Sequence, residues 1–369
     1  MNSKGNINKL VIIGGGSAYT PEIFDEIIRR KELDIRQIIL VDIEEGLERA
    51  RIICNLGKRM FRKAGIKCSL DLTLDRREAL KGADFVISQI RVGGENARIQ
   101  DELIGLQHNI IGQETTGAGG FINAMRTIPV MLDIARDMEE LCPHAWLINF
   151  TNPSGIITQA ISDHTTINVV GLCNVPINMQ SDIARILNTS IENVHCSFIG
   201  LNHLSFISSV VVNGRDVMPD ILESISGNET VMKNIPKVAG VGELSRVIGM
   251  VPSPYLQYYF FEEQMLHKQL DEWKSTGKTR GIITKEINQL LFEQYSNESL
   301  EEKPPALTQR GGSLYSFAAL NIIEALLSPV PQEMVLNIPA GGMIYDLDND
   351  DIVEINCMVS CNGIKPSLV

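Results

Sequence analysis

The sequence Lys9-Leu-Val-Ile-Ile-Gly-Gly-Gly-Ser-Ala-Tyr-Thr-Pro-Glu22 contains a short apolar run, three consecutive glycines and a proline. The apolar run predicts a buried parallel strand, and the proline is typical of the first turn of a helix. Glycines allow the backbone to approach a phosphate group closely, and the amides at a helix N-terminus can then bind that group. The residues of the predicted phosphate-binding turn are Gly14, Gly15, Gly16 and Ser17.

The next apolar run, Gln37-Ile-Ile-Leu-Val-Asp42, ends in an acidic residue. In a dinucleotide-binding βαβ unit, a carboxylate at this place binds the ribose hydroxyls of the adenosine, and it favours NAD over NADP. The glycine pattern departs from the usual fingerprint because Tyr19 stands where the third glycine is expected. The context predicts an NAD site with Asp42 as a ligand; the alternative is an α/β turn with a solvated Asp.

The rest of the chain divides into two halves with different patterns. Apolar runs that alternate with helical segments predict an α/β fold with a Rossmann-type domain over residues 1–175. Beyond it, residues 197–203 and 205–212 predict antiparallel strands, with a turn at Asn213-Gly214 and a late strand at 353–359. The predicted domains are an NAD-binding Rossmann-type domain, 1–175, and a C-terminal metal- and substrate-binding α+β domain, 176–369.

Cys173 and His203 are the candidate metal ligands, and each follows a short apolar run. A thiolate and an imidazole both suit a borderline-soft divalent metal. Two protein ligands leave positions open for oxygens of a substrate, which favours a catalytic Lewis acid over a structural metal. The alternative is two unrelated side chains, since Cys is among the residues most often buried.

Several polar residues near predicted strand ends could bind a ligand. Arg91 and Arg98 lie in what we expect to be a flexible loop after the strand at 84–90, and either could bind an anionic group bidentately. Arg91 could instead pair with a surface carboxylate. The polar, glycine-dense stretch 112–120 precedes a helix expected from about Ile122 to Leu141. Asn152 could bind a sugar hydroxyl or phosphate oxygen, although Asn before Pro is also a turn device.

The second half contains a cluster of tyrosines and two further candidate cations. Tyr255 belongs to a segment that holds three of the seven tyrosines of the chain. A phenol near a metal or cation could have its pKa lowered enough to act as a base. The alternative for this segment is the packed aromatic start of a helix. Arg280 and Arg310 could each bind an anion or be a surface charge.

The composition is that of an acidic globular protein. The 369 residues carry a net charge of −12, and 44% of them are hydrophobic, enough for two packed cores. This charge argues against nucleic acid or an anionic membrane as a partner. No apolar run reaches the length of a membrane span, and the N-terminal residues lack the apolar region of a signal peptide. We therefore expect a cytoplasmic protein with reduced cysteines.

Taken together, the motifs resemble those of the NAD-dependent family-4 glycoside hydrolases of the 6-phospho-β-glucosidase type. They occur in the family's order along nearly the whole chain. The matching segments are Gly14-Gly-Gly-Ser-Ala-Tyr-Thr-Pro-Glu, Ile90-Arg-Val-Gly-Gly, Gly112-Gln-Glu-Thr-Thr-Gly, Asn149-Phe-Thr-Asn-Pro, Cys173-Asn-Val-Pro, Gly200-Leu-Asn-His, Pro254-Tyr-Leu-Gln-Tyr-Tyr and Arg310-Gly-Gly.

The resemblance implies roles for the candidate residues. Cys173 and His203 would ligate a divalent ion, typically Mn²⁺, and Tyr255 would be the catalytic base. Asn174 resembles the β-type members, because α-acting relatives usually carry a proton-donating Asp at that place. The residues implied to contact the phosphorylated sugar are Arg98, Asn152 and Arg280. Members are also typically homodimers or homotetramers, with a second domain like that of lactate and malate dehydrogenases.

The implied reaction is the hydrolysis of 6-phospho-β-glucosides, such as cellobiose 6-phosphate or an aryl glucoside 6-phosphate. NAD⁺ accepts hydride from C3, the metal polarises the new ketone, and the base removes the acidified C2 proton. The aglycone then leaves, water adds, and NADH returns the hydride.

Three alternatives stay open at this point. They are a 6-phospho-α-glucosidase of the same family, an ordinary NAD-dependent dehydrogenase, and a catalytically impaired NAD or sugar-phosphate binding protein. The third arises because family members usually extend further at the C-terminal end.

Overall fold

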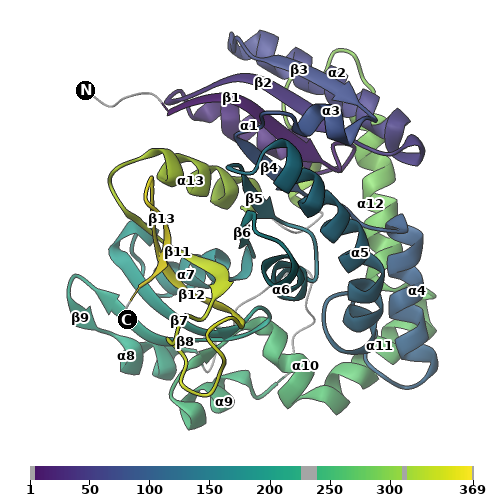
Figure 1. The fold of residues 1–369 in the computed structure, drawn as a ribbon. Helices are drawn as coiled ribbons and strands as arrows, with labels where there is room; N and C mark the ends of the chain where they lie inside the picture. The colour runs from purple at the N-terminus through teal and green to yellow at the C-terminus, as the bar shows by residue number, and fades with distance from the viewer. Residues whose placement is uncertain (1–4, 226–238, 310–313, 368–369) are drawn as a thin grey trace.

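The computed structural model describes residues 5–225, 239–309 and 314–367 (Figure 1). Its main feature is a nine-stranded sheet, of which six neighbouring strands are parallel in the order β3-β2-β1-β4-β5-β6. This is the strand order of dinucleotide-binding folds, in which the carboxyl ends of the strands form the ligand-binding edge. The six strands are β1 (Gly5–Ile13), β2 (Leu33–Val41), β3 (Ser69–Thr73), β4 (Phe85–Ser88), β5 (Trp146–Asn149) and β6 (Asn168–Gly171).

Three strands from the C-terminal part of the chain complete the same sheet. They are β11 (Gln332–Pro339), β12 (Ile352–Ser360) and β13 (Gly363–Pro366). β11 pairs antiparallel with β6 through Asn337 and Gly171, and β12 and β13 follow as antiparallel neighbours. The late strand expected at 353–359 is therefore present, and it extends the first sheet. The boundary at residue 175 stays a prediction, since the sheet runs across it.

Helices cover both faces of this sheet. Alternate residues of β1 point to opposite faces. Leu10 and Ile12 pack with α1 (Thr20–Arg29), α2 (Leu47–Ala64) and α13 (Tyr315–Leu327), whereas Val11 and Ile13 pack with α3 (Arg76–Leu80), α5 (Gly117–Leu141) and α6 (Ser154–His164). Burial on both faces explains why these strands are continuous apolar runs.

A smaller antiparallel sheet lies beside the large one. It consists of β7 (Val194–Leu201), β8 (Leu204–Val212), β9 (Arg215–Asp216) and β10 (Val251–Pro252), and it packs with α7 (Val175–Ile186) and α8 (Met218–Ser224). Asn213 and Gly214 both have positive φ between β8 and β9, which confirms the turn predicted there. The β7–β8 turn carries His203.

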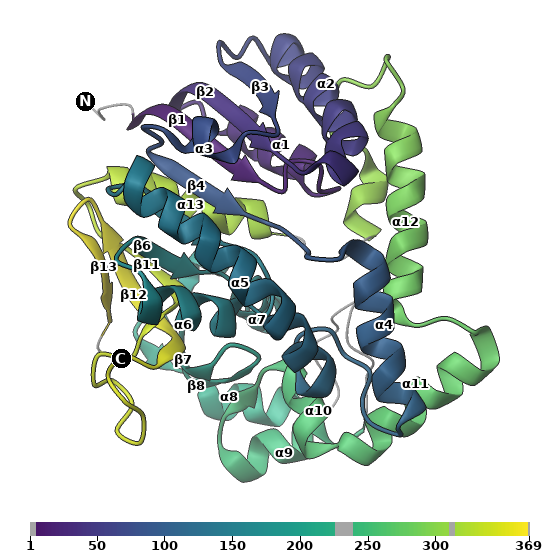
Figure 2. The same ribbon diagram turned by 45° about the vertical axis from the view of Figure 1, so that its right-hand side comes forward.

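The remaining helices include α4 and α12, which pack side by side, as Figure 2 shows. None of the helices within the described part of the chain is long and apolar enough to cross a bilayer. The bounds are α4 (Gly94–Gln107), α9 (Val241–Ile248), α10 (Gln257–Phe260), α11 (Glu262–Thr276) and α12 (Arg280–Tyr295), with short 3₁₀ helices at Glu44–Gly46, Ile191–Asn193, Pro254–Leu256 and Pro305–Gln309.

Two local predictions were wrong. Arg98 lies in α4 and not in a flexible loop, because Gly93 and Gly94 adopt positive φ and let the helix begin directly after a short turn. The helix expected from Ile122 begins at Gly117, so part of the glycine-dense stretch is helical. Gly119 and Gly120 allow close packing, since a Cβ on Gly119 would lie 2.3 Å from the carbonyl oxygen of Gln113.

Candidate active site

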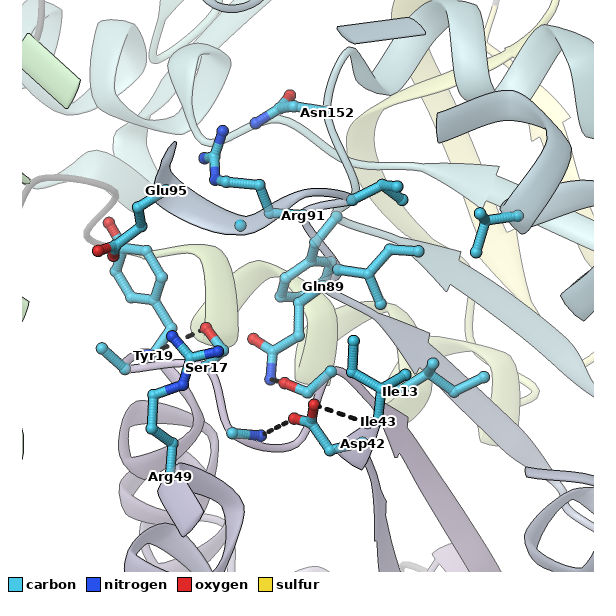
Figure 3. A pocket seen from close by; sticks show the side chains of 18 of the residues that line it. Ile13, Ser17, Tyr19, Asp42, Ile43, Arg49, Gln89, Arg91, Glu95 and Asn152 are labelled. Atoms are coloured by element: carbon cyan, nitrogen blue, oxygen red, sulfur yellow. Dashed lines mark hydrogen bonds between the residues drawn. The ribbon is translucent and has the colours of Figure 1, made fainter. Parts of the chain in front are cut away.

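The glycine-rich turn connects β1 with α1 at the carboxyl edge of the sheet. A Cβ on Gly15 would lie 2.6 Å from Cβ of Leu40, so this turn can pack against β2 only with glycine there. Gly14 has a φ of +86°, a conformation that other residues rarely adopt. The amide of Gly16 donates to Oδ2 of Asp42 over 2.6 Å, as Figure 3 shows. Asp42 therefore fixes the shape of the turn in addition to its predicted role as a ribose ligand.

One large cavity contains both the turn and most of the predicted substrate residues. Its volume is about 1120 Å³, above the roughly 300–1,000 Å³ typical of small-molecule sites, so it has room for a dinucleotide and a sugar together. One end is lined by the turn and Asp42. The far end is lined by four of the predicted residues, Arg98, Asn152, Asn174 and Tyr255.

Cys173 and His203 lie together beside the far end of this cavity. Cys173 follows β6, and His203 occupies the β7–β8 turn with a φ of +65°. Their Sγ and Nε2 atoms are 3.6 Å apart, and both side chains are buried. The two predicted ligands therefore meet, although the strands next to them belong to two different sheets.

The Cys173–His203 pair fits a shared divalent ion. Metal bonds of about 2.3 Å to sulfur and 2.1 Å to nitrogen place the two atoms about 3.1–3.6 Å apart at angles of 90–109°. Burial lowers the pKa of His203 to about 3, so its imidazole is neutral and able to ligate. In the described residues no cluster of three or more His, Cys, Asp or Glu side chains is suited to a metal. An ion held by this pair would therefore keep positions for other ligands.

The ring of Tyr255 stacks on the imidazole of His203, with ring centroids 3.6 Å apart and planes at 5°. Burial raises the pKa of Tyr255 well above its ordinary value, and Cys173 adds to this effect. The phenol is thus protonated in the protein alone. The lowered pKa expected of a base requires a cation beside the ring, and an ion on His203 and Cys173 would supply one.

Arg98 is the buried cation at the far end of the cavity. Its Nε donates to Oε1 of Glu102 over 2.9 Å, and its Nη1 lies 3.1 Å from Oε1 of Glu114. Burial lowers the pKa of Arg98, but Glu114 and Glu102 more than offset this and raise it. Arg91 also pairs with Glu114. The carboxylate that Arg91 binds is largely buried and lines the cavity, and so is not the surface group that the alternative assumed.

Asn152 and Asn174 line the same part of the cavity. In Figure 3, Asn152 and Arg91 lie on the opposite side of Gln89 from Asp42. The Oδ1 atom of Asn152 is buried and has no hydrogen-bond partner among the described residues, so it is suited to accept a bond from a ligand hydroxyl. Asn174 is the N-cap residue of α7, directly after Cys173.

Arg280 belongs to the described part of the chain, whereas Arg310 does not. Arg280 is the first residue of α12, one turn before Thr284, which lines the cavity. Arg310 and its Gly-Gly motif lie outside the described residues.

Sequence reasoning missed four residues that touch the predicted ones. Glu102 and Glu114 bind Arg98, the hydroxyl of Thr115 acts to lower the pKa of Tyr255, and the hydroxyl of Tyr315 acts to lower the pKa of Cys173. Glu114 and Thr115 lie in the polar glycine-dense stretch 112–120, so the composition of that stretch already indicated a functional segment. Glu102 follows Arg98 by four residues, a helical ion-pair spacing, but the segment was expected to be a loop. Tyr315 has no local signal.

Two family models together match nearly the whole chain. The model described as family 4 glycosyl hydrolase matches residues 9–189, and the model of the family 4 glycosyl hydrolase C-terminal domain matches residues 198–369. The chain belongs to family 4 of the glycosyl hydrolases. The family predicted from the motifs is confirmed.

Relatives of this family 4 glycosyl hydrolase agree with that assignment. A probable 6-phospho-beta-glucosidase of Bacillus subtilis strain 168 is 42% identical over 365 residues, which cover 98% of this chain and 82% of that protein. The solved 6-phospho-beta glucosidase of Thermotoga maritima with manganese, NAD+ and glucose-6-phosphate has a TM-score of 0.87 and 33% identity, covering 98% of this chain and 84% of that chain.

A second solved structure concerns the fold alone. Lactate dehydrogenase of Eimeria maxima, solved with NADH and oxamate, has a TM-score of 0.56 at 14% identity and covers 98% of this chain and 88% of that chain. With the family match, it confirms the predicted fold class of a Rossmann-type domain and a dehydrogenase-like C-terminal domain.

Proposed function

We propose that this family 4 glycosyl hydrolase is a 6-phospho-β-glucosidase that requires NAD and a divalent metal, with Mn²⁺ as the expected ion. The observation that carries the proposal is the arrangement of the cavity. A glycine-rich turn occupies one end, a phenol and a buried arginine occupy the other, and a thiol–imidazole pair lies directly beside that phenol. The 42% identity to the Bacillus relative supports the β-type substrate.

One end of the cavity binds the cofactor, and the other end binds the substrate. The turn of Gly14–Ser17 with Asp42 holds the dinucleotide, and Cys173 with His203 holds the ion. NAD bound there supplies a temporary hydride acceptor at C3, and the divalent ion supplies a Lewis acid that also favours the ionised phenol of Tyr255. Tyr255 then takes the proton from C2 of the sugar during elimination of the aglycone.

The other residues position the phosphorylated sugar. A guanidinium carries five N–H donors, and the contacts of Arg98 with Glu102 and Glu114 use two of them. Arg98 and Arg280 bind the phosphate, and Asn152 accepts a bond from a sugar hydroxyl. Asn174 favours the β-type reaction over the α-type, because an amide cannot donate a proton as a carboxylic acid does.

Two properties of the whole protein belong to the same proposal. We place the enzyme in the cytoplasm, which the free state of its seven cysteines supports. We also propose a homodimer or homotetramer, as expected for the family, with phosphorylated disaccharides or aryl glucoside 6-phosphates as substrates.

Measurement of NADH during turnover tests the proposal against an NAD-dependent dehydrogenase. Because hydride returns to the sugar, nitrophenol release from p-nitrophenyl β-glucoside 6-phosphate should far exceed any NADH formed. NADH that accumulates in proportion to the substrate consumed would mean a dehydrogenase. Binding of NAD and glucose 6-phosphate without any turnover would mean a binding protein.

A further inference from the structure

Glu102 links two helices that carry predicted substrate residues. Its side chain is 2% exposed. One carboxylate oxygen, Oε1, accepts the bond from Nε of Arg98 over 2.9 Å on the same helix, α4. The other, Oε2, accepts a bond from the backbone amide of Gly281 over 2.7 Å. Gly281 is the second residue of α12, so a single buried carboxylate joins α4 to the start of α12.

This contact stabilises the N-terminus of α12. The first amides of a helix have no partner within the helix, and an N-cap side chain commonly supplies one. Thr279, the N-cap residue of α12, makes no such bond. Glu102 supplies the acceptor from the neighbouring helix, and its negative charge is favoured at a helix N-terminus. Figure 2 shows α4 and α12 side by side, as this contact requires.

The packing around Gly281 leaves little freedom for the two helices. A Cβ on Gly281 would lie 3.0 Å from Oε2 of Glu102 and 3.0 Å from Cγ1 of Ile99. Arg280 directly precedes Gly281, so the same contact fixes the backbone that carries Arg280. The separation of Arg98 and Arg280 is therefore set through Glu102.

We propose that Glu102 is a positioning residue for substrate recognition. It holds the guanidinium of Arg98 and the N-terminus of α12 in the relative position at which Arg98 and Arg280 bind one phosphate group. This inference rests on the proposed function, because it needs a phosphorylated sugar at this end of the cavity. Glu102 would not contact the substrate itself, and it would affect substrate binding only by positioning Arg98 and Arg280.

The main test compares Glu102→Gln with the parent chain. Glutamine keeps the size of the side chain but replaces one carboxylate oxygen with an NH₂ donor, which would face either the Nε–H of Arg98 or the N–H of Gly281. We expect the affinity for glucose 6-phosphate, measured by calorimetry, to fall about tenfold, and KM for p-nitrophenyl β-glucoside 6-phosphate to rise about as much. We expect kcat to change less than about threefold and NAD affinity to stay the same.

Glu26→Gln is the matched control. Glu26 pairs with Arg30 across four residues, the same separation as in the Arg98–Glu102 pair, and the side chains of Glu26 and Arg30 are 13% and 10% exposed. Glu26 lies on α1 and Arg30 is the C-cap residue of that helix, and neither residue lines the cavity. The control should lower Tm by a similar amount and leave KM and glucose 6-phosphate affinity unchanged.

Gly281→Ala is a second variant that keeps every charge. Alanine is favoured over glycine inside a helix, so this variant should fold. Its Cβ pushes the helices apart by a few tenths of an ångström. We expect the same weakening of glucose 6-phosphate affinity in a smaller amount.

The outcomes separate the two proposals. A selective loss of glucose 6-phosphate affinity in Glu102→Gln and Gly281→Ala supports the role of Glu102. Unchanged affinity in both variants, or an equal loss in Glu26→Gln, overturns it. Absence of turnover in the parent chain contradicts the proposed function, whereas the glucose 6-phosphate affinities still decide the role of Glu102.

Discussion

The two ends of the cavity differ in how far apart in the sequence their residues lie. At the cofactor end, the amide of Gly16 and the carboxylate of Asp42 are 26 positions apart and belong to one βαβ unit. At the substrate end, Glu102 and Gly281 are 179 positions apart, and Cys173 and His203 come from different sheets. A local motif thus builds the first end, and the tertiary fold builds the second.

The two ends also differ in burial. Asp42 is partly exposed, whereas Cys173, His203 and Arg98 are buried. Electrostatic interactions are stronger where water is excluded, so charges at the substrate end have larger effects. Variants at the substrate end should therefore affect turnover more than those at the cofactor end. A substitution at one end should leave ligand binding at the other end unchanged.

The largest effect should come from His203→Ala. Loss of this ligand removes a Lewis acid worth several kcal/mol, so metal-dependent turnover should fall at least about 10³-fold. The rise in Tm on adding NAD should persist, because the cofactor end is separate. His195→Ala, at a half-exposed position, is the control. Full activity in His203→Ala would show that His203 does not ligate a catalytic metal.

Tyr255→Phe should lower kcat by about 10²–10³-fold, within the range typical for loss of a general base. Phenylalanine can still stack on His203, so the affinities for metal and NAD should be retained. Nitrophenol release measures kcat, and calorimetry measures the affinities. Tyr259→Phe, half exposed on α10, should behave like the parent. A kcat equal to that of the parent would exclude Tyr255 as the base.

Arg280→Ala should reduce the preference for phosphorylated over plain β-glucosides by about 10–100-fold, because a charged hydrogen bond is lost. The comparison of kcat/KM for the two substrates measures this preference. Lys278→Ala, which removes an exposed charge two positions earlier, is the control. An unchanged preference in Arg280→Ala would show that the phosphate binds elsewhere.

Asp42→Asn should weaken NAD binding about tenfold and leave glucose 6-phosphate affinity unchanged. The amide group of asparagine would place a donor near the amide of Gly16, where the carboxylate now accepts. Calorimetry with each ligand separates the two ends. Glu48→Gln, an exposed change on α2, is the control. Equal weakening of both ligands would mean that the two ends are not independent.

Glu22→Gln, in the first turn of α1, should have the smallest effect. Burial raises the pKa of Glu22 above 4.5, although Lys303 opposes this. For a raised carboxyl pKa, the stabilising contribution is complete below the unfolded value and is lost as pH rises through the folded value. The Tm of the parent relative to the variant should therefore decline from about pH 4.5 upward. A constant Tm difference across this range would contradict the shift.

The cofactor end could be predicted from the sequence in physical terms. The glycine-rich turn and Asp42 lie in one short segment, and periodicity places the strands that carry them. The joining of β11 to β6 could not be predicted, because Gly171 and Asn337 are far apart in the chain. The helical setting of Arg98 was missed because two glycines precede it, a pattern typical of loops.

At the substrate end, residue chemistry predicted candidates but not their neighbours. Cys173 and His203 were paired because both suit one metal. The family resemblance supplied the roles of Tyr255 and Arg280. Glu102 depends on the packing of α4 against α12, which no local pattern reports.

The most direct test of the central claim is nitrophenol release from the β- and α-anomers of p-nitrophenyl glucoside 6-phosphate, with NAD⁺ and Mn²⁺ each omitted in turn. We expect release from the β-anomer alone, and loss of that release when either NAD⁺ or Mn²⁺ is absent. Release that continues without NAD⁺ or metal, or release from the α-anomer alone, would contradict it.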